Sequence, residues 1–175
     1  MIKRNILILT VIFVALYSAT AFALDLKSDA FKDGGYIPAR NTCDDANMSP
    51  PLSWTDVPFN TQTFVIICND ADAAYEDWVC WLMFNIPVER REFSEDQPRQ
   101  TRFPNDMMQG INDYGNIGYD GPCPPPGKTH RYLFTLYALD TRLQLPAEYS
   151  KLEIREAMKG HILAETRLTG LYKRR

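Results

Sequence analysis

Residues 120–139 read DGPCPPPGKTHRYLFTLYAL. The first half holds four prolines and two glycines, and it cannot form a helix because proline lacks an amide donor and fixes its own φ angle. The second half, from Tyr132 to Leu139, is aromatic and apolar, which predicts a strand. His130 lies at the exit of the stiff loop, a position where binding groups are often found.

Further strands are predicted on both sides of this stretch. Thr63–Cys68 and Trp78–Ile86 are continuous apolar runs, typical of strands buried on both faces. Pro50–Trp54 predicts a short edge strand, since proline is tolerated there. Ala164–Tyr172 alternates and predicts a last strand, whereas the charged segment Arg90–Asn105 predicts an exposed loop. The pattern indicates one mostly β domain.

One helix is predicted near the C-terminal end. Ser150-x-x-Glu153 forms a capping box, a signature of a helix start. Residues at helical spacing follow and leave one apolar face: Ile154, Ala157 or Met158, His161 and Glu165. Gly160 is expected near the helix end, and His161 is expected to have a structural role.

The first 23 residues have the composition of a secretory signal peptide. Lys3 and Arg4 precede an apolar run over residues 6–16, and Ala21-Phe22-Ala23 has the pattern of a cleavage site. The run is shorter than the ~20 residues that span a bilayer. We therefore expect cleavage after Ala23, a single domain over 24–175, a periplasmic or secreted protein and no stable membrane anchor. The alternative is an uncleaved N-terminal anchor.

The charge of the chain argues against some partners. The formal net charge is −3, and loss of Lys3 and Arg4 leaves a more acidic protein. Nonspecific nucleic-acid binding needs a basic surface, so no nucleic-acid partner is expected. Net charge also gives no attraction to anionic lipids.

Four cysteines lie after the expected cleavage site: Cys43, Cys68, Cys80 and Cys123. An oxidising compartment permits disulfides. Four cysteines allow three full pairings, and the sequence alone does not choose among them. Cys68 and Cys80 fall in predicted strands, where buried thiols are also ordinary.

Two carboxylates follow the first buried strand directly, Asp70 and Asp72, and Trp78 begins the second. Aspartates in such a position are commonly part of a solvated turn, because they bond to their own backbone. The other interpretation is a site at the ends of two strands.

Four ordered segments carry a family resemblance. They are Asn47-x-Ser49-Pro50-Pro51-Leu52-Ser53-Trp54; Asp70-x-Asp72-Ala73 with Trp78 and Asn85-Ile86-Pro87; residues 109–127 with His130-Arg131-Tyr132; and Gly160-His161-Ile162-Leu163. From Phe31 to Tyr172 the chain resembles the phosphatidylethanolamine-binding protein family, in its bacterial Raf-kinase-inhibitor-like (YbhB/YbcL) branch. The resemblance implies a single-domain antiparallel β-sandwich with Greek-key character and a small peripheral C-terminal helix.

The resemblance also implies a small pocket that binds anions such as phosphate, a phosphoryl head group or a carboxylate. Carried over position by position, its residues are Asp70, Asp72, Ala73, Trp78, Cys80, Gly121, Cys123, Pro124, His130 and Tyr132. An imidazole can donate a hydrogen bond to an anion, and backbone amides at a glycine-proline turn can form an anion nest. A carboxylate would repel an anion, so Asp70 is expected to orient His130 or to hold loop amides.

This chain departs from the family pattern around the pocket. Ala71 and Ala74 stand where the family has prolines, and Cys80 stands where it has a pocket histidine. A thiol is a weak donor, which puts the inherited ligand in doubt. Exported members of the family imply a disulfide between Cys43 and Cys123; the rival pairing is Cys68 with Cys80.

The sequence thus predicts an exported, non-enzymatic binding module that takes a small anion such as a phosphate monoester and could modulate an unknown protein partner. No cofactor or metal is expected, since the His and Cys spacing matches no compact zinc motif. One alternative is a thiol-dependent enzyme that uses Cys80, His130 and Asp70 or Asp72, which requires a reactive thiolate at Cys80. The other is an inhibitor or regulator of a protease or host protein.

Overall fold

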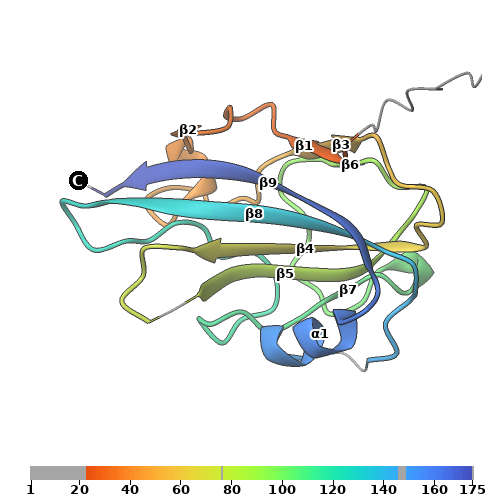
Figure 1. The fold of residues 1–175 in the computed structure, drawn as a ribbon. Helices are drawn as coiled ribbons and strands as arrows, with labels where there is room; N and C mark the ends of the chain where they lie inside the picture. The colour runs from red at the N-terminus through yellow and green to blue at the C-terminus, as the bar shows by residue number, and fades with distance from the viewer. Residues whose placement is uncertain (1–22, 76, 146–148, 175) are drawn as a thin grey trace, which may run out of the picture.

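A computed structural model describes residues 23–75, 77–145 and 149–174 (Figure 1). Residues 1–22 of the expected signal peptide lie outside the described residues, so export and cleavage after Ala23 remain predictions. Among the described residues, no helix is both long enough and apolar enough to cross a membrane.

The structure consists of two β-sheets and a short helix. The elements are β1 (Asp25–Lys27), β2 (Gly35–Tyr36), η1 (Ala39–Asn41), β3 (Leu52–Thr55), β4 (Thr63–Asp70), β5 (Trp78–Pro87), β6 (Glu92–Phe93), η2 (Pro104–Asp106), β7 (Met108–Gln109), β8 (Thr129–Leu139), α1 (Lys151–Met158) and β9 (Ile162–Lys173). The mostly β fold expected from the sequence is confirmed.

The large sheet has the strand order β2-β9-β8-β4-β5-β7, and the small sheet has the order β1-β3-β6. Neighbouring strands are antiparallel except β2 and β9, which pair in parallel through two residues each. Chain order β4, β5, β7, β8 becomes spatial order β8-β4-β5-β7, which is the Greek-key arrangement.

Strand β4 lies at the centre of the molecule, with every residue buried. Because successive side chains of a strand point to opposite faces, Phe64 and Ile66 belong to the core between the sheets, and Val65 and Ile67 to the core beneath α1. Figure 1 shows the small sheet and α1 on opposite sides of the large sheet. This double coverage explains why β4 is continuously apolar from Phe64 to Cys68.

The predicted helix forms, but it is shorter than expected. A capping box joins Ser150 and Glu153 at the helix start, and the Ser150 amide donates to Glu153 Oε2 at 3.0 Å. The helix ends at Met158, and Gly160 adopts a positive φ of 78° that turns the chain. His161 and Glu165 therefore lie beyond the helix, because β9 already begins at Ile162.

Two other expectations from the sequence were wrong. The segment around Trp54 is not an edge strand, since β3 lies between β1 and β6, and both prolines precede it at positions 50 and 51. The segment Arg90–Asn105 is not wholly an exposed loop, because it contains β6. Phe93 of β6 is 2% exposed and packs against Trp54 and Trp81, with ring centroids 5.5 and 6.1 Å apart.

A disulfide joins Cys43 to Cys123 across 80 positions of sequence, whereas Cys68 and Cys80 are free and buried. The structure thus has the pairing that the family resemblance implied. Closing so long a loop restricts the unfolded chain far more than the folded one.

We predict that the double substitution of Cys43→Ser and Cys123→Ser lowers the free energy of unfolding by roughly 2–4 kcal/mol. Urea unfolding followed by circular dichroism measures this loss. A reductant should shift the wild-type curve by a similar amount and leave the variant curve unchanged. Equal stability of the oxidised wild type and the variant would contradict the prediction.

Candidate functional site

A cleft of about 480 Å³ lies at the end of the large sheet where β4 ends and β5 and β8 begin. The register brings these ends together, because Asp70 pairs with Trp78 of β5 and with Tyr132 of β8. The lining residues are Asp70, Asp72, Ala73, Ala74, Tyr75, Trp78, Tyr114, Cys123, Pro124, Pro125, Pro126, Lys128 and His130.

Seven of the predicted site residues line this cleft: Asp70, Asp72, Ala73, Trp78, Cys123, Pro124 and His130. Larger hollows of about 660 Å³ beside Phe103 and about 700 Å³ beside Tyr172 contain none of the predicted residues. We therefore place the candidate site in the cleft, where the polar side chains converge, although it is not the largest hollow.

Asp70 and His130 form a buried pair in the cleft wall. Asp70 Oδ2 lies 2.8 Å from His130 Nδ1, and both side chains are 8% exposed. Asp70 Oδ1 accepts a hydrogen bond from the Asp72 amide at 2.9 Å. Because an ionised carboxylate only accepts hydrogen bonds, Nδ1 carries a proton. Nε2 has no hydrogen-bond partner among the described residues and is left for a ligand.

Asp72 is held by Arg131. The guanidinium donates from Nε to Oδ2 at 2.9 Å and from Nη2 to Oδ1 at 2.7 Å, and the Arg131 amide donates to Oδ2 at 2.8 Å. These bonds, which outweigh the effect of burial, lower the pKa of Asp72 to about 2. Asp72 is therefore a paired carboxylate that fixes the loop after β4 to the start of β8.

Three predicted residues lie near the cleft without lining it. Cys80 and Tyr132 are fully buried, and the Cys80 thiol has the Trp78 carbonyl oxygen as a weak acceptor at 3.9 Å. The Tyr132 hydroxyl is buried without a hydrogen-bond partner among the described residues, and burial, with the charge of Asp70, raises its pKa. A Cys80 thiol in this position is not exposed to attack a ligand in the cleft.

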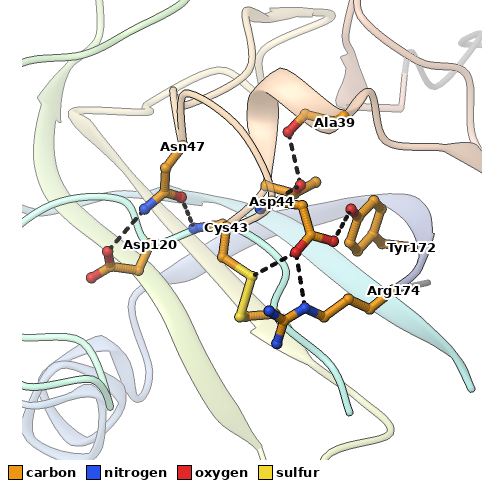
Figure 2. Close-up of a disulfide and its surroundings, with 10 residues drawn as sticks. Ala39, Cys43, Asp44, Asn47, Asp120, Tyr172 and Arg174 are labelled. Carbon is orange, nitrogen blue, oxygen red and sulfur yellow. Dashed lines mark hydrogen bonds and ion pairs between the residues drawn. A yellow bond between two sulfur atoms is a disulfide. The ribbon is translucent and has the colours of Figure 1, made fainter. Parts of the chain in front are cut away.

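Gly121, the third of these residues, packs where only glycine fits. A Cβ at this position would come within 2.5 Å of the Asn41 carbonyl oxygen. The Gly121 amide donates to Asn47 Oδ1 at 2.7 Å, and Asn47 Nδ2 donates to Asp120 at 3.3 Å (Figure 2). This amide therefore already has a partner and holds the loop rather than facing the cleft.

The Cys123 side of the cleft is fixed by a disulfide and by the hydrogen bonds around it, and Figure 2 shows this disulfide with its surroundings. The disulfide ties Cys123 to Cys43, and the neighbouring Asp44 accepts hydrogen bonds from the Tyr172 hydroxyl at 2.6 Å and Arg174 Nε at 2.8 Å. These groups connect the proline-rich loop to the end of β9. The loop is thus rigid for a covalent reason as well as for its proline content.

The opposite side of the cleft is aromatic. Trp78 meets Tyr114 nearly edge to face, with centroids 5.3 Å apart and an interplanar angle of 85°, and Tyr75 lies 6.5 Å from Trp78. Tyr75 is 76% exposed at the rim. The position of Tyr114 is fixed by the two residues before it, Asn112 and Asp113, which form hydrogen bonds to the backbone of β5 at Val79 and Cys80.

Sequence reasoning missed several residues around the cleft. Tyr114 and Arg131 stood within the quoted motifs, and Lys128 stood two residues before His130, so position along the chain could have indicated them. Tyr75 lies between Asp72 and Trp78, so its position near the two carboxylates was also visible in the sequence. No cluster of three or more His, Cys, Asp or Glu side chains suited to a metal ion occurs in the described parts of the chain.

Comparisons with known proteins agree with this architecture. The model of the family described as phosphatidylethanolamine-binding protein matches residues 27–173. A UPF0098 protein of Methanothermobacter thermautotrophicus is 50% identical over 151 residues, which cover 86% of this chain and 99% of the relative. A UPF0098 protein of Aquifex aeolicus is 42% identical over 91% of this chain and 94% of its own length.

Two solved structures share the fold. The putative phosphatidylethanolamine-binding protein homolog CT736 of Chlamydia trachomatis superposes with a TM-score of 0.80 at 35% identity, covering 88% of this chain and 99% of its own. E. coli YbcL, titled a new member of the mammalian PEBP family, gives a TM-score of 0.81 at 29% identity, covering 87% and 99%. The chain therefore belongs to the phosphatidylethanolamine-binding protein family.

Proposed function

We propose that this protein is an exported binding protein that captures a small anion, a phosphoryl group or a carboxylate, in the cleft beside His130, without catalysing a reaction. The observation that carries the proposal is the buried His130–Asp70 pair. It holds the ring through Nδ1 at 2.8 Å and leaves Nε2 without a hydrogen-bond partner among the described residues. Both residues of the pair line the cleft.

The two carboxylates in the cleft do not prevent anion binding, because each is already paired. Arg131 balances the charge of Asp72 through two side-chain bonds. Asp70 is balanced when His130 is protonated. Lys128, exposed at the rim, then adds a positive charge without an acidic partner among the described residues.

The proton on His130 decides whether an anion is held. With Nδ1–H directed at Asp70, Nε2 of a neutral ring can only accept a hydrogen bond, whereas the charged ring donates from both nitrogens. A charge-assisted bond from Nε2 is about twice as strong as a neutral one. Anion binding is therefore tied to protonation of His130.

We predict saturable binding of acetate, inorganic phosphate and phosphoethanolamine, observed by NMR at the His130 ring and the Cys123 amide. His130→Gln should weaken binding by at least about tenfold, since a hydrogen bond to a charged group is worth about 1.5–3 kcal/mol.

His161→Gln is the matched control. His161 also bonds through Nδ1 to an aspartate, Asp140, at 2.8 Å, but it lies in the turn before β9 and does not line the cleft. This variant should bind acetate as the wild type does. Absence of shifts at millimolar concentrations of all three anions would contradict the proposed function.

We further predict that the Asp72 carboxyl titrates near pH 2 in the folded protein and moves toward the ordinary value of about 3.9 in Arg131→Met. Because the folded pKa is lowered, the stability that the pair contributes is full above about pH 4. It is lost as the pH falls toward 2. Carboxyl ¹³C NMR measures the two midpoints, and equal midpoints would show that Arg131 does not hold Asp72.

A further inference from the structure

Asp77 is an acidic residue next to the cleft that does not line it. It directly precedes β5 and has a positive φ of 67°, a left-handed conformation that is uncommon for any residue but glycine and is best tolerated by asparagine and aspartate. The backbone at Asp77 sets the direction in which the chain enters Trp78.

Three side chains from two other elements hold the Asp77 carboxylate. Asn69 Nδ2 of β4 donates to Oδ1 at 3.0 Å. Lys151 Nζ lies 3.0 Å from Oδ2, and Arg155 Nη1 donates to the same oxygen. Lys151 also donates to the Asp77 carbonyl oxygen. The two cations lie four residues apart on α1, which places them on one face of the helix.

The cluster differs from the exposed ion pairs of the same surface. The Lys151 and Asp77 side chains are 18% and 33% exposed. For comparison, the ion pair between Glu156 of α1 and Lys159, just after the helix, has side chains that are 58% and 70% exposed. Fully exposed pairs contribute little because water and salt screen them. Burial alone would raise the pKa of Asp77, but the bonds and charges of Lys151 and Arg155 outweigh it and hold that pKa below its ordinary value.

The cluster of Asp77, Asn69, Lys151 and Arg155 lies where it can fix the position of the aromatic side of the cleft. Trp78 is the next residue, and its ring contacts those of Tyr75 and Tyr114. No residue of α1 lines the cleft among the residues described. The helix itself is anchored to the core by Ile154 and Met158, so its cations form a fixed support.

We propose that Lys151 and Arg155 are positioning residues that, through Asp77, hold the Trp78 side of the cleft in place and so couple the surface of α1 to ligand binding. The coupling to binding rests on the proposed function, whereas the positioning of Trp78 does not. Because coupling between two sites is reciprocal, an anion in the cleft also stabilises the contact of α1 with Asp77.

The test compares Asp77→Asn and the double variant of Lys151→Met and Arg155→Met with the wild type. Asparagine keeps the left-handed conformation accessible, and it removes the charge together with one of the two acceptor oxygens. In ligand-free protein we expect a displaced Trp78 indole NMR signal and at least about tenfold faster hydrogen exchange at the Trp78 amide. The Cys123 amide, on the disulfide side, should be unchanged.

Inorganic phosphate is the binding probe, and its affinity should fall about three- to tenfold in both variants. Lys159→Met is the matched control, because it removes an exposed cation beside the same helix and should change neither readout. Arg155→Lys keeps the charge and should retain the wild-type Trp78 signal, which a purely steric role of the arginine would not predict.

The outcomes separate the two proposals. If the wild type binds no phosphate but the Trp78 signal moves in both variants, the proposed function fails and the positioning role stands. If Trp78 and its exchange rate are unchanged in both variants, the positioning role is overturned. Weaker phosphate binding with an unchanged Trp78 signal also overturns it, because the cations would then act on the ligand directly.

Discussion

The pairing of β4 with β5 on one side and β8 on the other is the constraint on which the rest of the structure depends. Every residue of β4 is buried, so the strand can satisfy its backbone groups only through this ladder. The ladder places Asp70 opposite both Trp78 and Tyr132. The strand pairing that satisfies the buried backbone groups of β4 therefore also brings the cleft residues of three strands together at one end of the sheet.

The long strands could be predicted from the sequence because a buried strand requires a run of apolar residues, which is visible locally. Thr63–Cys68, Trp78–Ile86 and Tyr132–Leu139 are predominantly apolar, and each forms a strand. The sequence indicated β3 as a short strand but not its central position in the small sheet, and it did not indicate β6. The two strands are only four and two residues long, and their place follows from packing of Trp54 and Phe93 in the core between the sheets. The predicted helix was too long because His161 and Glu165 continue the helical spacing beyond Gly160, where the chain turns.

The residues of the candidate site could be predicted where they lie within continuous sequence motifs. Asp70, Asp72 and His130 were found because they flank strand ends within recognisable motifs. The hydrogen-bond partners of these residues could not be predicted in the same way. The bond from Arg131 to Asp72, for example, depends on the register between β4 and β8, which the sequence does not show. Cys80 shows the reverse case. It occupies a motif position, but its short side chain is fully buried and lies outside the cleft lining.

The two sides of the cleft are held by forces of different kinds. On the Cys123 side, a disulfide, prolines and the Asn47–Gly121 hydrogen bond fix the loop, and neither salt nor pH changes near neutrality weaken a covalent link. On the Trp78 side, the fixing group is an ion cluster with a partly exposed carboxylate, and dissolved ions screen such interactions. Under the proposed function, a ligand therefore meets one wall of the cleft that is fixed covalently and one that is held by ion pairs. If α1 positions Trp78 as proposed, the aromatic wall is the one that adapts to the ligand.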